Sequence, residues 1–150
     1  MRRVVLVSAL KNSMQLKYLT TNDWALLKTI SRRQVFKPRE MIITINSRPN
    51  TLFILAAGSA VVEVLRGTTI AKLAPGDVCG EMAFIESNAA SASVVAETET
   101  TVDAVDFPAL TEVFNHHPHL EARFYKSLAL LLSQRLRATS MQLSKAAART

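Results

Sequence analysis

The sequence predicts an α+β domain in which an antiparallel β-barrel or sandwich is flanked by N-terminal helices and a long C-terminal helix. Apolar residues recur at helical spacing before residue 33 and again after residue 107. Between these segments, a proline or glycine stands about every nine residues and separates short runs of Ile, Val, Leu and Thr, which is typical of strands joined by turns. The strand-rich part therefore lies in the middle of the chain.

The N-terminal segment is expected to be helical over residues 10–33. Its apolar residues recur three to five positions apart, at Leu16, Leu19, Trp24, Leu27 and Ile30. The polar stretch 20–23 interrupts this pattern and predicts two short helices. Thr21 or Asn22 is expected to cap the second helix, because short polar side chains accept hydrogen bonds from the first free amides of a helix.

The middle segment, residues 36–107, is expected to form the β-structure. Runs rich in β-branched and aliphatic residues, each bounded by turn residues, predict the strands Met41–Ile45, Thr51–Leu55, Ala60–Leu65, Thr69–Leu73, Ser93–Glu97 and Thr101–Asp106. Their regular spacing favours antiparallel pairing through short connections.

Residues 108–146 are expected to be helical again, as Pro108–Phe114 and as one long helix from Pro118 to about Lys145. The long helix would span roughly 40 Å, which is more than a small barrel can cover. Its later part keeps a narrow apolar stripe at Leu132, Leu136, Thr139 and Leu143. This stripe either packs on the parent domain or forms a two-helix seam in a homodimer. The homodimer is favoured, because the helix is longer than the barrel can cover.

Length and composition favour one domain over residues 1–150, with 49% hydrophobic residues and few glycines and prolines. The single cysteine excludes an internal disulfide framework and suits a cytoplasmic protein. The opening apolar run is short and ends at Lys11, so a secretion signal is not expected. No segment reaches the roughly 18 apolar residues of a membrane span, so no membrane association is expected.

The net charge of +6 is unevenly distributed along the chain. Residues 1–50 carry +8, residues 51–107 carry −6 and residues 108–150 carry +4. The basic residues interleave with apolar positions rather than cluster, so we interpret them as a solvated surface rather than a nucleic-acid site.

The most informative segment is Leu73–Val94, LAPGDVCGEMAFIESNAASASV. Together with FKPREMII at Phe36, LFILAAGSAV at Leu52, HPHL at His117 and QRLR at Gln134, it resembles the cyclic nucleotide-binding domain family of the catabolite-activator and protein-kinase-A regulatory-subunit type. The resemblance covers roughly residues 16–137 and implies a jelly roll. The segment itself resembles the family's phosphate-binding cassette.

The resemblance implies a ligand site whose residues are Gly80, Glu81, Met82, Ala83, Ala90, Ser91 and Ala92. In the family, the Gly-Glu carboxylate accepts a hydrogen bond from the ribose 2′-hydroxyl, so Glu81 inherits that role. An arginine about nine residues later binds the cyclic phosphate, but Ala90 stands at this position. Ser91 follows it and is a possible ligand contact, or a small strand-entry residue whose hydroxyl is already satisfied.

The missing arginine predicts weak or absent binding of cAMP and cGMP. A charge-assisted hydrogen bond contributes about 1.5–3 kcal/mol and truncating one partner of a buried charge pair costs about 2–5 kcal/mol, so the affinity should fall by about tenfold to a few thousandfold. No Lys or Arg occurs between Lys72 and Arg123, so realignment supplies no substitute. Arg48, Arg66 or Arg123 could replace the missing charge only by folding inward, and we expect nothing cationic across from Gly80.

Two other groups of residues have a structural and a chemical interpretation. Cys79 is expected to be a buried, inert thiol rather than a redox sensor, because no basic neighbour in sequence lowers its pKa. His116, His117 and His119 are expected to be exposed turn residues, and no metal site is predicted.

Phe84 and Phe124 resemble the family's hydrophobic contacts between cassette and closing helix, although either could be ordinary core.

The function expected from these features is a non-enzymatic regulatory module. Its long helix would pass ligand occupancy to a dimer mate or an effector protein whose identity is unknown. The alternative is a degenerate, ligand-free domain that serves in homodimerisation or protein interaction.

Residues 36–107 contain no histidine, which disfavours a cupin-like metalloenzyme. No DNA-binding domain is expected after the long helix. No cofactor is expected beyond a possible cyclic nucleotide or other small ligand.

Overall fold

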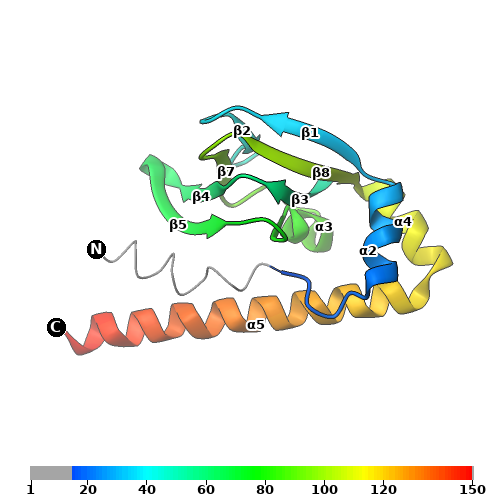
Figure 1. Cartoon of the computed structure of the whole chain (residues 1–150). Coiled ribbons are helices and arrows are strands. Elements are labelled where there is room, and N and C mark those ends of the chain that lie inside the picture. The colour runs from blue at the N-terminus through cyan, green and yellow to red at the C-terminus, as the bar shows by residue number, and fades with distance from the viewer. Residues whose placement is uncertain (1–14, 150) are drawn as a thin grey trace.

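Two four-stranded antiparallel sheets face each other in the computed structural model, which describes residues 15–149 (Figure 1). The first sheet has the order β1 (Arg32–Phe36), β8 (Thr100–Asp106), β3 (Thr51–Ala57), β6 (Val78–Cys79). The second has the order β2 (Met41–Ile43), β7 (Ser93–Ala96), β4 (Ala60–Val64), β5 (Thr68–Leu73). The predicted jelly-roll architecture is confirmed, with a short 3-10 helix, η1 (Leu65–Gly67), between β4 and β5.

The sheets bury a common apolar layer because alternate strand residues point inward. In the register of β3 and β8, Leu55 lies opposite Val102, and both side chains are buried in the layer between the sheets. Leu52 and Val105, also opposite each other, face the other side of the sheet and pack in the cluster that includes the helices. The β3–β4 connection turns at Gly58, whose φ is 87°. A Cβ at this position would overlap the carbonyl oxygen of Glu99, so only glycine fits the turn.

Two predictions for the N-terminal segment are wrong. One helix is described there, α2 (Thr21–Thr29), whereas residues 15–20 are not helical and the earlier part of the predicted helices lies outside the described residues. The N-cap is Thr20, not Thr21 or Asn22. Its hydroxyl accepts from the Asp23 amide at 3.1 Å and its own amide donates to the Asp23 carboxylate at 2.9 Å. This reciprocal capping box requires an acidic residue three positions after the cap, which fixes the start of the helix.

The predicted helical limit at residue 33 is also wrong, because β1 begins at Arg32. Pairing with β8 places Arg33 opposite Asp103, and the two side chains form an ion pair at 3.1 Å. Arg32, which lies opposite Ala104, forms a diagonal ion pair with Asp106 at 2.8 Å. Ile30 continues the helical spacing and hides this change of structure in the sequence.

The chain ends in α4 (Phe107–His116) and α5 (Pro118–Ala148), which agrees with the two predicted C-terminal helices. α5 runs along one side of the roll, with α2 and α4 at its N-terminal end (Figure 1). The short helix α3 (Glu81–Glu86) lies between the roll and α5. An aromatic cluster joins these helices, with contacting rings contributed by Phe84, Phe107, Phe114, Phe124 and Tyr125.

Candidate functional site

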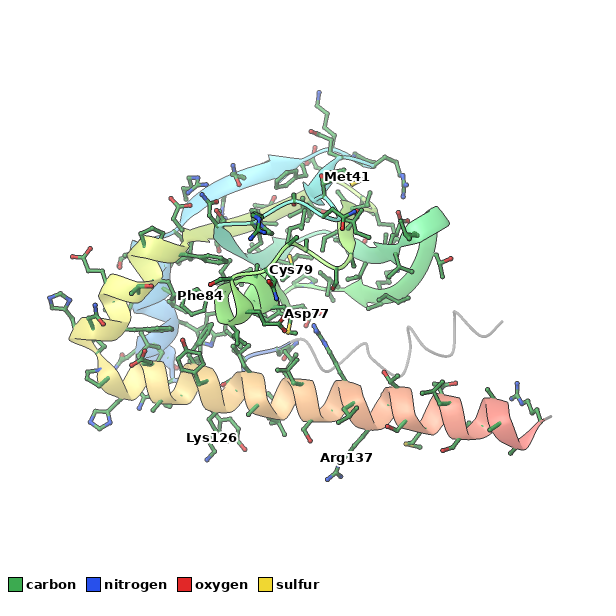
Figure 2. The ribbon with its side chains drawn as sticks, turned by 180° about the vertical axis from the view of Figure 1, so that it is seen from behind. Met41, Asp77, Cys79, Phe84, Lys126 and Arg137 are labelled. Atoms are coloured by element: carbon green, nitrogen blue, oxygen red, sulfur yellow. The ribbon has the colours of Figure 1, made fainter. Side chains whose placement is uncertain are left out.

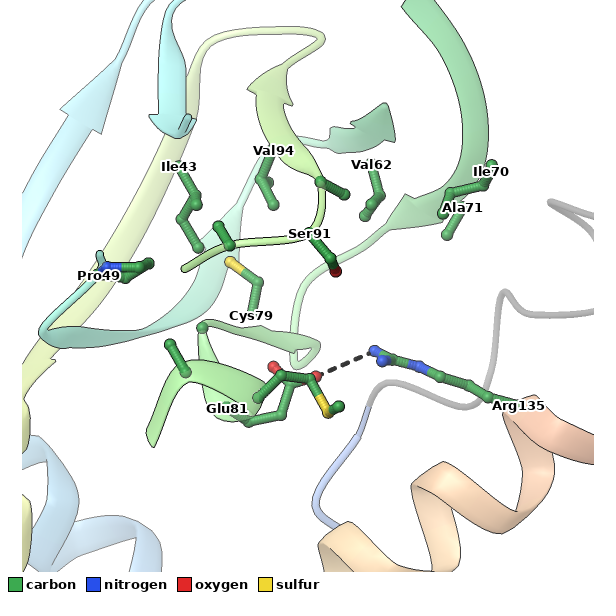
Figure 3. Close-up of a pocket in the computed structure, with 15 residues that line it drawn as sticks. Ile43, Pro49, Val62, Ile70, Ala71, Cys79, Glu81, Ser91, Val94 and Arg135 are labelled. Carbon is green, nitrogen blue, oxygen red and sulfur yellow. Dashed lines mark ion pairs between the residues drawn. The ribbon is translucent and has the colours of Figure 1, made fainter. Parts of the chain in front are cut away.

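A cavity of about 160 Å³ opens between the second sheet, α3 and α5 (Figure 3). All seven residues predicted for the ligand site lie on its wall: Gly80, Glu81, Met82, Ala83, Ala90, Ser91 and Ala92. The rest of the wall consists of Ile43, Pro49, Val62, Ile70, Ala71, Cys79, Val94 and Arg135. The structure thus brings the predicted residues together at one cavity, and their role as ligand contacts stays a prediction.

Gly80 shapes the base of the cavity. Its φ of 89° lies in the left-handed region, and a Cβ here would come within 2.6 Å of the Thr51 carbonyl oxygen. Glycine adopts this conformation without strain, so the chain can leave β6 and enter α3 directly. Gly80 is the N-cap of α3, and its carbonyl accepts a hydrogen bond from the Phe84 amide at 3.3 Å.

The opposite wall is the loop before β7. Ala90 is held by two backbone hydrogen bonds: its amide donates to the Ser47 carbonyl at 2.7 Å, and its carbonyl accepts from the Asn46 amide at 2.8 Å. The Ser93 hydroxyl accepts from the Ile45 amide at 2.8 Å and is buried. The loop is therefore well fixed, but at position 90 it presents a methyl group where the resemblance implies a guanidinium.

Sequence reasoning missed the cation of this cavity. Arg135 extends from α5 and its guanidinium lies 3.2 Å from the Glu81 carboxylate (Figure 3). The Glu81 side chain is 3% exposed and that of Arg135 is 23% exposed. Burial raises the pKa of Glu81, and the nearby guanidinium acts in the opposite direction. The expectation that nothing cationic lies across from Gly80 is therefore wrong.

Of the three arginines considered as substitutes, Arg123 and Arg48 have other partners. Arg123 binds the Asp23 carboxylate through two hydrogen bonds of 2.6 and 2.8 Å. Arg48 is exposed and donates to the Ser87 carbonyl at 3.3 Å. The side chain of Arg66 lies outside the part of the chain that the structure describes. Helix periodicity could have found Arg135, because it follows the buried Leu128 and Leu131 by seven and four positions on the same face.

Cys79 lies in the cavity wall as a buried thiol, and burial raises its pKa. An ionised thiolate is the reactive form of cysteine, so this environment favours an unreactive side chain. The aromatic contact between Phe84 and Phe124 is present, with ring centroids 6.0 Å apart in an edge-to-face arrangement. Phe84, labelled in Figure 2, therefore connects the helix that contains Glu81 to the closing helix α5.

His116, His117 and His119 lie at the exposed junction of α4 and α5. The His116 Nδ1 atom lies 2.9 Å from the Glu112 carbonyl oxygen. Within residues 15–149, these histidines and the acidic residues form no group able to hold a metal ion. In the same part of the chain, no helix combines the length and apolar character needed to cross a bilayer.

Comparison with known proteins identifies the fold. The solved structures similar to this chain include a cyclic nucleotide-binding domain from Methylobacillus flagellatus, with a TM-score of 0.76 and 23% identity, covering 95% of this chain and 83% of that one. They also include the catabolite activator protein of Thermus thermophilus, with a TM-score of 0.71 and 24% identity, covering 86% of this chain and 61% of that one.

The curated relatives are much longer proteins. Cyclic GMP-binding protein C of Dictyostelium discoideum is 28% identical over 123 residues, which is 79% of this chain and 5% of that protein. Glutaminase 2 of Bradyrhizobium diazoefficiens is 28% identical over 118 residues, 79% of this chain and 19% of that protein. The chain thus spans a small part of the curated relatives it matches.

The family match itself extends from residue 33 to residue 117, which includes most of the roll, the cassette-like loop and α4. With the jelly roll, the short helix after Gly80 and the closing helix α5 all in place, this chain belongs to the cyclic nucleotide-binding domain family.

Proposed function

We propose that this chain is a non-enzymatic regulatory module that holds a small ligand in the cavity of residues 80–92 and binds cAMP and cGMP weakly or not at all. The observation that carries the proposal is the Ala90 methyl group in an otherwise intact wall. The backbone around it is fixed on both sides, so the position is formed but has no charge with which to neutralise a cyclic phosphate.

Electrostatics supports the weak binding of cyclic nucleotides. The carboxylate of Glu81 is almost completely buried on the cavity wall, and its cationic partner comes from α5 rather than from the cassette. A phosphate that binds the Arg135 guanidinium leaves the Glu81 carboxylate without this partner. A phosphate that does not bind Arg135 finds no cation in the cassette. Either arrangement loses about tenfold to a few thousandfold in affinity relative to a cassette with its arginine.

Signal transmission is proposed to run through α5. α3 provides Glu81 to the cavity and Phe84 to the aromatic cluster, and α5 contacts both residues through Arg135 and Phe124. A ligand that moves α3 therefore changes the docking of α5, which passes the change to a partner protein or a second copy of the chain.

The ligand-free alternative, a homodimerisation or protein-interaction element, is favoured by the exposed apolar residues of α5. Leu136 is 68% exposed and Leu143 is 66% exposed on the stripe predicted from the sequence. Leu132, on the same stripe, is half-buried and packs against the core. The apolar stripe of α5 therefore has two exposed leucines available for contact with a partner helix.

Isothermal titration calorimetry with cAMP and cGMP tests the proposal on the wild type and on Ala90→Arg. We expect weak or no binding to the wild type and at least about tenfold tighter binding to Ala90→Arg, since the arginine restores a charge-assisted contact. Asn88→Arg is the matched control, because Asn88 is exposed in the same loop and does not line the cavity. It should leave affinity unchanged.

Submicromolar binding of either nucleotide to the wild type would contradict the proposal. If neither protein binds a cyclic nucleotide and a thermal-shift screen finds no small molecule that stabilises the wild type, the ligand-free alternative is the function supported.

A further inference from the structure

We infer that the cavity takes an uncharged, benzene-sized ligand, because Glu81 and Arg135 already neutralise each other on its wall. This inference rests on the proposed function and adds the chemical class of the ligand. It follows from the lining of the cavity, the separation of the two charges and their unequal exposure.

The lining is mostly aliphatic. Ten of the fifteen wall residues contribute only hydrocarbon side chains or a methyl thioether: Ile43, Pro49, Val62, Ile70, Ala71, Met82, Ala83, Ala90, Ala92 and Val94. The polar side chains described on the wall are the ion pair, the Ser91 hydroxyl and the Cys79 thiol. An apolar surface of this kind favours a ligand with an apolar body, and Ser91 adds one hydroxyl for orientation.

The ion pair sets the charge that the ligand can carry. The two charged groups are 3.2 Å apart, so an uncharged ligand can bind without separating them. An anion that takes Arg135 leaves the Glu81 carboxylate, 3% exposed, without its cationic partner. A cation that takes Glu81 releases a guanidinium that is 23% exposed and can turn toward water. The expected order of affinity is therefore uncharged, then cationic, then anionic.

The size of the cavity sets the size of the ligand. In another protein, an aliphatic cavity of roughly 150 Å³ binds benzene, and the cavity here measures about 160 Å³. Met82 and Ser91 are exposed among its lining residues, so the cavity has access to solvent. Benzyl alcohol, benzylammonium and benzoate have the same ring and carbon count and differ in charge, which makes them matched probes.

The first test is a titration of the ¹⁵N-labelled chain with each probe at pH 7, followed by amide chemical shifts. Benzyl alcohol is expected to shift the amides of residues 80–92 and to bind at least about tenfold more tightly than benzoate, the ratio that one lost charge-assisted contact produces. Benzylammonium should lie between them. Benzoate or benzylammonium binding as tightly as benzyl alcohol would overturn the inference.

The second test changes the charges. Glu81→Gln removes the negative charge 3.2 Å from the Arg135 guanidinium, so benzoate should bind about tenfold more tightly than it binds the wild type. Glu86→Gln removes a carboxylate from the exposed face of the same helix and should have no effect. Arg135→Met is an independent variant in case Glu81→Gln does not fold. It should improve benzylammonium binding by a similar factor, with Arg137→Met, exposed on α5, as its control. An unchanged probe order in both cavity variants contradicts the inference.

These outcomes separate the inference from the proposed function. If Ala90→Arg binds a cyclic nucleotide but the wild type binds no probe, the inference fails while the ligand cavity stands. If neither binds, both fail.

Discussion

The two halves of α5 contact the rest of the molecule in different ways. In the first half, Leu120, Phe124, Ser127, Leu128 and Leu131 are buried against the roll, α2 and α4. From residue 132 to residue 148, all within the described part of the chain, no side chain is fully buried. The interaction described between this second half and the ligand cavity is the ion pair of Arg135 and Glu81. One helix therefore combines a first half anchored by buried apolar residues with a largely exposed second half, which contacts the core through Leu132 and the cavity wall through Arg135.

This difference teaches which part of the helix stabilises the fold and which part can respond to the cavity. Apolar burial in the first half stabilises the packing of α5 on the rest of the molecule. The ion pair, in contrast, lies on the cavity wall, so we expect a ligand that perturbs Glu81 to perturb the docking of the second half. The predictions below test the two halves separately.

The largest effect is expected in the anchored first half. Phe124→Ala removes a fully buried ring from the aromatic cluster and should lower the free energy of unfolding by about 3–5 kcal/mol, the usual cost of an aromatic deletion in a core. Leu136→Ala, in the second half and 68% exposed, should change it by less than about 0.5 kcal/mol in a monomer. Urea denaturation at low protein concentration measures both. Equal losses would show that the two halves are not distinct.

An intermediate effect is expected from the ion pair. Arg135→Met leaves Glu81 buried without its cationic partner and should lower the free energy of unfolding by about 1–3 kcal/mol, below the full cost for a completely buried pair since Arg135 is 23% exposed. Hydrogen exchange should show a larger loss of protection in residues 132–148 than in residues 118–131.

Arg137→Met is the matched control, because Arg137 points away from the roll on the same helix (Figure 2). It should leave both the stability and the exchange pattern unchanged. A uniform loss of protection along the whole of α5 in Arg135→Met would contradict the separate roles of the two halves.

The smallest effect is the pH dependence of the anchored first half. The hydrogen bonds from Arg123 lower the pKa of Asp23 from 3.8 to about 2. A carboxyl group whose pKa is lowered in the folded state stabilises the fold above pH 4, and that contribution is lost as the pH falls toward 2. We expect it to be about 1–2 kcal/mol, because each pKa unit corresponds to about 1.4 kcal/mol and Arg123 is partly exposed.

Denaturation of the wild type and Asp23→Asn at several pH values measures this contribution. The difference in stability between the two proteins should shrink between pH 4 and pH 2. A difference that stays constant over this range would exclude the ion pair as its source.

The sequence predicted those parts of the structure that depend on residues close together in the chain. Turn residues and aliphatic runs predicted six of the eight strands, and the resemblance predicted that Gly80 and Ala90 share a site, which agrees with their positions on one cavity wall. The strands without a prediction have weak local signals. β1 is mostly polar and β6 has two residues, so each is defined by pairing with a distant strand.

The principal miss, Arg135, has the same cause. Glu81 and Arg135 are 54 positions apart in the sequence, and their contact depends on how α5 crosses α3. Residue spacing could place Arg135 on the inner face of its helix. Residue spacing could not show that Glu81 of α3 lies opposite Arg135.

The continuity of α5 has a mechanical consequence. After Pro118 the helix contains neither proline nor glycine, so it lacks the usual kink sites and we expect it to move as a rod. Leu131, its last buried residue, is the pivot we expect for such a motion. At 1.5 Å per residue, Arg135 lies about 6 Å beyond this point and Ala148 about 26 Å beyond it. A displacement of about 1 Å at the cavity is therefore magnified roughly fourfold at the distal tip.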